Sequence, residues 1–157
     1  MNRLLNGIAA GAAGTSALNA VTYLDMVVRA RPASSTPEDT VRKFEELTGL
    51  TITKDGPDSA SAANRRSALG ALLGIVSGLG VGAVYGLLRP YVRAPLALLG
   101  IGAGVAANIG TTGPMVALGI TDPRTWSADS WISDIVPHLA YGLATAAVFE
   151  GLHGREN

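Results

Sequence analysis

Glycine recurs at every fourth position of one uncharged stretch, and this row limits the fold more than any other feature. The stretch 70–86 reads GALLGIVSGLGVGAVYG, with its row at Gly70, Gly74, Gly78, Gly82 and Gly86. In a water-soluble helix, each interior glycine costs about 1 kcal/mol relative to alanine. In lipid, small residues at this spacing let two helix backbones approach closely. The row therefore predicts a membrane helix that packs through its glycines.

Charged side chains are separated from the apolar segments. None occurs in 4–24, 68–88 or 94–120, whereas 29–66 holds more than half of those in the chain. About 20 apolar helical residues cross the hydrocarbon core of a bilayer. We therefore predict an all-α polytopic membrane protein that forms a single integral membrane domain over 1–157. Its four transmembrane helices, packed through glycine-rich faces, are expected at about 4–28, 68–88, 94–120 and 132–150.

Two alternatives remain at this stage. Arg3 followed by an apolar segment also fits a secretory signal peptide, although the segment is longer than the usual 7–15 apolar residues and polar residues interrupt it. A water-soluble helical fold is the second alternative. Membrane fractionation of the expressed protein distinguishes a membrane protein from a soluble one.

The polar loop 29–67 contains a second kind of helix signal. Thr36 is a predicted N-cap, Pro37 follows at the first helical position, and Gly49 ends the pattern, which predicts a short helix at 37–48. Its apolar residues recur along one narrow face, as expected for a helix at the lipid headgroups. Docking of a soluble partner is the alternative role. The polar stretch 54–64 that follows is predicted to be a flexible linker.

Proline and tryptophan mark the ends of the later helices. Pro90 and Pro95 predict a tight connection, which would make the second and third membrane helices antiparallel neighbours. Pro114, after Gly113, predicts a kink in the third helix. Trp126 and Trp131 flank a polar turn, which is typical of the membrane interface.

The fourth helix carries the candidate polar site. Asp134, His138 and Tyr141 stand at positions i, i+4 and i+7, on one helical face. Ionisable groups inside a membrane helix are costly and often functional, and this face suits proton relay or pH sensing. In the alternative interpretation, Asp134 caps the helix, Pro137 lies in its first turn, and His138 bonds a neighbour such as Asn108.

The remaining residue types indicate no reaction. The chain has no cysteine, and its two histidines, His138 and His153, are about 22 Å apart along a helix. We therefore expect no metal site and no cofactor. Motifs of common hydrolases, nucleotide-binding proteins and zinc proteases are absent. The formal net charge of zero gives no electrostatic footprint for nucleic acid.

The carboxyl third resembles a known family. The run GPMVALGITDPRTWSADSWISDIVPHLAYG at 113–142, with Trp131, His138 and Gly142, is similar to the closing part of the YagU-like small bacterial inner-membrane proteins. The biochemical function of that family is unknown. The resemblance implies a polytopic inner-membrane protein in which the His138 position matters, and the long first loop does not match the family.

These observations lead to two functional hypotheses. The first is a non-enzymatic structural or accessory protein of the bacterial inner membrane, in contact with the lipid bilayer and with a second copy or another membrane protein. The second is a small channel or transporter for protons or small solutes that uses Asp134, His138, Tyr141 and Asn108. Both chain termini are expected on the same side, and the distribution of Lys and Arg favours a cytoplasmic first loop.

Overall fold

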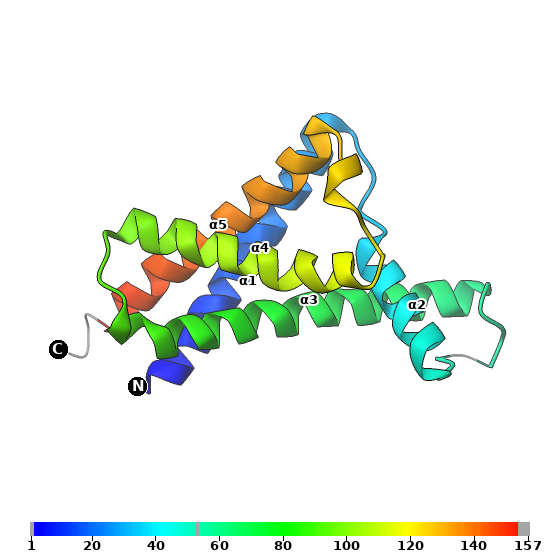
Figure 1. The fold of residues 1–157 in the computed structure, drawn as a ribbon, viewed down its shortest axis with the longest axis horizontal. Coiled ribbons are helices and arrows are strands. Elements are labelled where there is room, and N and C mark those ends of the chain that lie inside the picture. The colour runs from blue at the N-terminus through cyan, green and yellow to red at the C-terminus, as the bar shows by residue number, and fades with distance from the viewer. Residues whose placement is uncertain (1, 53, 154–157) are drawn as a thin grey trace.

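The computed structural model describes residues 2–52 and 54–153, in which only helices and their connections occur (Figure 1). The five α-helices are α1 (Arg3–Arg29), α2 (Thr36–Thr48), α3 (Ala60–Leu88), α4 (Leu96–Ala117) and α5 (Ala128–His153). Two short 3₁₀ helices, η1 (Arg89–Tyr91) and η2 (Pro123–Thr125), lie in the connections on either side of α4. The predicted all-α class is confirmed.

Three of these helices, not four, are long and apolar enough to cross a membrane: α3 continued through η1, α4 and α5. The prediction of four membrane helices is thus confirmed for three of them, whereas α1 does not meet this criterion. This helix has 27 residues and is therefore long enough. Its apolar character is diluted by alanine, glycine and polar side chains such as Asn6, Thr15 and Asn19.

Helices α1 and α5 pack against each other over much of their lengths and run in opposite directions (Figure 1). Helix α3 packs on α1, and α4 packs on α5. The start of α1 and the end of α5 lie at the same end of the α1–α5 pair (Figure 1). The tight connection after Pro90 reverses the chain as predicted, but α3 and α4 contact each other far less than each contacts its main partner. The expectation that these two helices are close neighbours is therefore only partly met.

The backbones of α1 and α3 approach closely where both carry glycine. A methyl group added at Gly82 would lie 2.5 Å from the Cα atom of Gly11 and 2.5 Å from the carbonyl oxygen of Gly7. One added at Gly7 would lie 3.1 Å from the Cα atom of Gly86. Real Cβ atoms do not tolerate such distances, so these positions accept only glycine without a shift of the helices.

The other glycines of the row differ in their surroundings. A methyl group at Gly70 would lie 2.7 Å from the Cβ atom of Pro37 in α2, whereas Gly78 faces Thr15 and Tyr141. No heavy atom outside the local helix lies within 4 Å of a methyl group built at Gly74. The row is thus not one continuous contact surface within this chain.

Helices α4 and α5 have a separate close contact. A methyl group at Gly142 would lie 2.7 Å from the Cα atom of Gly104, and one at Gly100 would lie 2.9 Å from the Cα atom of Leu143. Gly100 and Gly104 of α4 therefore face α5 rather than the row on α3.

The predicted loop helix is present. It begins one residue early, at Thr36, with Ser35 as its cap, and it ends at Gly49 in the left-handed conformation (φ 70°). Val41 is buried against α3, whereas Phe44 and Leu47 remain exposed. The prediction of a flexible linker at 54–64 is wrong from residue 60 onward, because Ser59 caps the Ala62 N–H and α3 starts there.

Candidate functional site

Four polar side chains meet between α4 and α5. The Asn108 amide nitrogen donates to the Asp134 carboxylate and lies 3.3 Å from His138 Nδ1. His138 Nδ1 is 2.7 Å from the Asp134 carbonyl oxygen, and Nε2 is 3.3 Å from Thr111 Oγ1. The predicted association of Asp134, His138 and Asn108 is present, and Thr111 joins it. We call these four residues the α4–α5 polar cluster.

The hydrogen-bond partners define the proton positions on His138. A carbonyl oxygen only accepts, so the contact with the Asp134 carbonyl places a proton on Nδ1. Nε2 of the neutral ring then accepts from the Thr111 hydroxyl. When the ring is protonated, Nε2 donates to Thr111 Oγ1, whose proton turns to the Ala107 carbonyl oxygen 3.0 Å away. The cluster therefore satisfies both charge states of His138 by rotation of one hydroxyl.

Tyr141 belongs to a different environment. Its side chain is 1% exposed, and its hydroxyl donates to the Gly78 carbonyl oxygen of α3 at 2.6 Å. The predicted polar face of α5 is thus divided: Asp134 and His138 face α4, while Tyr141 packs between α1 and α3. The alternative in which Asp134 caps the helix is wrong, because α5 begins six residues earlier, at Ala128.

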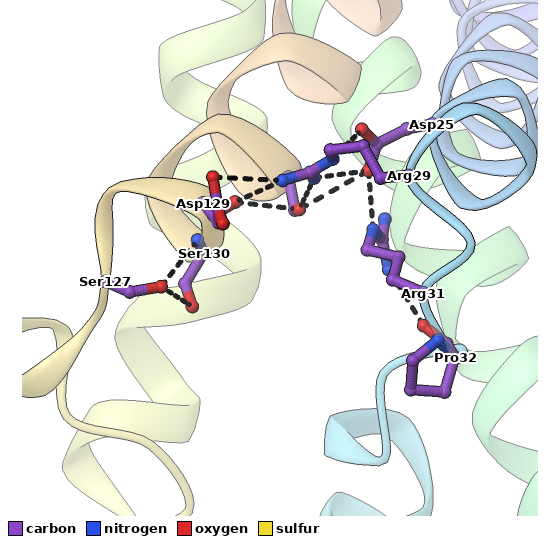
Figure 2. A network of polar contacts seen from close by, with 8 residues as sticks. Asp25, Arg29, Arg31, Pro32, Ser127, Asp129 and Ser130 are labelled. Atoms are coloured by element: carbon purple, nitrogen blue, oxygen red, sulfur yellow. Dashed lines mark hydrogen bonds and ion pairs between the residues drawn. The ribbon is translucent and has the colours of Figure 1, made fainter.

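A charged network joins the end of α1 to the start of α5 (Figure 2). The Asp25 carboxylate accepts from Arg29 through both oxygens, each at 2.6 Å, and from Arg31 Nε at 2.5 Å. Arg29 also donates to Ser133 Oγ and lies 3.5 Å from the exposed Asp129 carboxylate. Asp25 thus forms ion pairs with both arginines.

The contacts of this network with α5 were not foreseen. They are made by Arg29 and Asp25. The pairing of Arg31 with Asp25 depends on a turn at Ala30, whose left-handed conformation (φ 48°) ends α1 and brings Arg31 back toward Asp25. An alanine in this conformation carries no sequence signal, since glycine or asparagine is the usual residue there. Ser133 looked like an ordinary polar residue beside Asp134.

An ion pair attaches α2 to the first turns of α3. Arg66 Nε donates to Glu45 Oε2 at 2.7 Å, and the Ile52 N–H donates to Glu45 Oε1 at 3.1 Å. Both charged side chains are about one tenth exposed, at 12% and 10%. The Arg66 guanidinium and then the Ile52 N–H hold the pKa of Glu45 below its ordinary value.

At the opposite end of the α1–α5 pair, the chain forms a hollow of about 110 Å³. We call it the terminal hollow, and it is lined by Arg3, Arg89, Pro90, Phe149, Glu150 and His153. Arg89 Nε forms an ion pair with Glu150, and its Nη1 donates to the Val92 carbonyl oxygen at 2.7 Å.

Several buried polar atoms have no hydrogen-bond partner in the described part of the chain. They are both amide atoms of Asn6, Tyr85 Oη, Thr145 Oγ1 and His153 Nδ1. Asn6 and Thr145 are completely buried. Such orphaned groups are unusual in natural proteins and call for an explanation.

Within 2–52 and 54–153, no group of three or more His, Asp or Glu side chains is arranged to hold a metal ion. Comparison of the chain with family models, with curated proteins and with solved structures found no match.

Proposed function

We propose that this chain is a non-enzymatic integral membrane protein of the bacterial inner membrane, with a structural or accessory role. The observation that carries the proposal is the combination of three helices able to cross a membrane with largely exposed apolar surfaces. Leu72, Val76 and Ile109 are more than half exposed on these helices. In water such a surface would favour aggregation, whereas acyl chains solvate it.

Helix α1 is proposed to cross the membrane with them as a fourth helix. It is less apolar than the others, but α3 and α5 both pack along it. Its most polar early residue, Asn6, is completely buried between its neighbours, and Ser16 donates to the Ala12 carbonyl oxygen of its own helix. This packing compensates for the low apolar content of α1.

The glycines are proposed to act as a zipper that holds α1 to α3. Close backbone approach is a main source of helix association in lipid, because there is little hydrophobic driving force between helices. The distances at Gly7, Gly11 and Gly82 support this role. The exposed side of α3 around Gly74 is left for lipid or for a second copy of the chain.

Membrane fractionation with tags at both chain ends tests the placement. We expect the protein to remain in the membrane fraction after a carbonate wash. Protease added to one side of the membrane should cleave either both tags or neither of them. Recovery in the soluble fraction, or tags on opposite sides, would overturn the four-helix arrangement.

A matched pair of variants tests the zipper. Gly82→Ala is expected to lower the unfolding free energy in detergent by about 1–3 kcal/mol, because the added methyl group overlaps α1. Gly74→Ala has the same chemistry but meets no neighbour, and it is expected to be neutral or stabilising by up to about 1 kcal/mol. Equal effects of the two substitutions would refute the zipper.

Proton conduction is the second candidate function, and the α4–α5 polar cluster favours it. A group that exchanges a proton without losing hydrogen bonds suits a relay, and His138 meets this condition. Tyr141 lies apart from the cluster and bonds α3 instead, which weakens the case for the proton relay that the sequence suggested. Proton flux into liposomes that is abolished in His138→Ala, but not in Ser16→Ala on exposed α1 surface, would favour conduction over the structural role.

Membership of the YagU-like family stays a prediction from the carboxyl third of the sequence. The proposed inner-membrane location agrees with this membership. The structural role is proposed without reference to the activity of that family, which is unknown.

A further inference from the structure

The terminal hollow carries more basic than acidic side chains. Arg3 and Arg89 face it together with a single carboxylate, that of Glu150. Arg89 Nε donates to Glu150, and Arg89 Nη1 donates to the Val92 carbonyl oxygen. Arg3 is exposed and has no carboxylate partner among the described residues. The hollow therefore offers two guanidinium groups to an anion.

Most of the orphaned polar atoms gather at the same end of the molecule. Asn6 follows Arg3 by one helical turn, Tyr85 precedes Arg89 by one turn, and His153 lines the hollow itself. The three helix ends are in contact there, since a methyl group at Gly86 would lie 2.9 Å from the Cα atom of Gly7. Only Thr145, two turns back along α5, lies outside this group. Most of the buried polar atoms without a hydrogen-bond partner thus lie at the same end of the molecule as the basic hollow.

The length of α5 places the hollow at the level of lipid headgroups. Its 26 residues extend about 39 Å, close to the roughly 40–45 Å of a bilayer with its polar regions. Tyr91, which is 84% exposed, follows Arg89 at this end, and aromatic residues of this kind are enriched at the membrane interface. Exposed Leu87 and Leu88 lie just below it, where acyl chains would run.

We propose that the terminal hollow binds the phosphate of an anionic phospholipid headgroup, with the guanidinium groups of Arg3 and Arg89 donating to the phosphate oxygens. Guanidinium groups match phosphate in geometry and form charge-assisted hydrogen bonds with it. Glu150 fixes the orientation of Arg89, and the excess positive charge disfavours headgroups that carry their own cation. The proposal rests on the membrane placement proposed above.

Native mass spectrometry of the full chain in mild detergent tests this site with added phosphatidylglycerol. Arg3→Gln is expected to weaken lipid retention about tenfold, the usual effect of losing a charge-assisted hydrogen bond. Arg93→Gln is the matched control, because it removes the same charge at the same end from an exposed residue outside the hollow. It is expected to leave retention unchanged.

Three outcomes would overturn the proposal. The first is an equal loss of phosphatidylglycerol retention in Arg3→Gln and Arg93→Gln. The second is that the wild-type protein retains phosphatidylcholine as well as it retains phosphatidylglycerol. The third is complete displacement of the lipid by inorganic phosphate, which would identify free phosphate as the ligand. Each variant is also fractionated. Membrane-bound wild-type protein with no lipid preference refutes the headgroup site alone, whereas soluble wild-type protein refutes the proposed function.

Discussion

A single hydroxyl group connects the centre of α5 to α3. Tyr141 is buried where α1, α3 and α5 meet, and its hydroxyl donates to the Gly78 carbonyl oxygen. Tyr141→Phe keeps the ring and removes this bond, so we expect a loss of about 1 kcal/mol in unfolding free energy. Thermal unfolding in detergent measures it. Tyr91→Phe, at an exposed ring, is expected to have no effect, and a similar loss there would contradict the assignment.

At the residue scale, the sequence predicted that Asp134, His138 and Asn108 come together, but it did not predict which other residues belong to the polar cluster. The spacing of Asp134 and His138 was sufficient to place them on one face, and Asn108 was a natural partner as an amide in an apolar helix. Thr111 shares that face, three residues after Asn108, but its role required knowing that α4 packs on α5. Tyr141 was assigned to the same face because spacing alone does not show that α5 has neighbours on two sides.

At the scale of elements, helix types were predictable and their partners were not. Pro37 and Gly49 bounded α2 to within one residue, because caps and proline act locally. The polar composition of residues 60–64 favours a linker, but Ser59 is the N-cap of α3 and the helix begins at Ala60. The pairing of α3 with α1 rather than α4 depends on backbone fit at Gly7 and Gly82, which periodicity does not reveal.

The attachment of α2 to α3 is expected to depend on pH through Glu45. Its folded-state pKa lies below the ordinary 4.5, because Arg66 stabilises the carboxylate. The stabilisation is therefore complete above about pH 4.5 and is lost as the pH falls through the lower folded-state pKa. Hydrogen exchange of the α2 amides should rise over this acidic range.

Glu45→Gln should remove that pH dependence and raise exchange already at neutral pH. Glu46→Gln is the control, since Glu46 is exposed and pairs only with Lys43 of its own helix. If exchange in Glu45→Gln keeps the wild-type pH profile, another group controls the attachment of α2.

At the scale of the whole molecule, the α1–α5 pair is fastened at one end by Arg29. Arg29→Met leaves Asp129 without its α1 partner and leaves Ser133 only its 3.4 Å contact with Asp25 in α1. It also removes one of the two cations that neutralise Asp25. We expect a lower unfolding temperature in detergent and stronger protease cleavage near residue 30. Arg124→Met removes an exposed arginine whose contacts are limited to neighbouring Asp122, and it should match the wild type. Equal destabilisation by both would show a general effect of charge.

The exposed side of α3 makes a second prediction at this scale. No heavy atom of residues 2–52 and 54–153 outside the local helix lies within 4 Å of a methyl group built at Gly74, so we expect a larger side chain there to leave the monomer undisturbed. Gly74→Leu should abolish crosslinked dimers in membranes if a second copy packs on this side, while the monomer keeps its unfolding temperature. Dimers that persist would place the contact between copies elsewhere.

The pairing of α1 with α5 also has a consequence for biosynthesis. Arg29 and Ser133, which join the two helices, are separated by 104 positions in the chain. Helix α1 therefore completes these contacts only after α5 has been synthesised. Until then, the polar residues of α1 need shelter from α3 or from the insertion machinery.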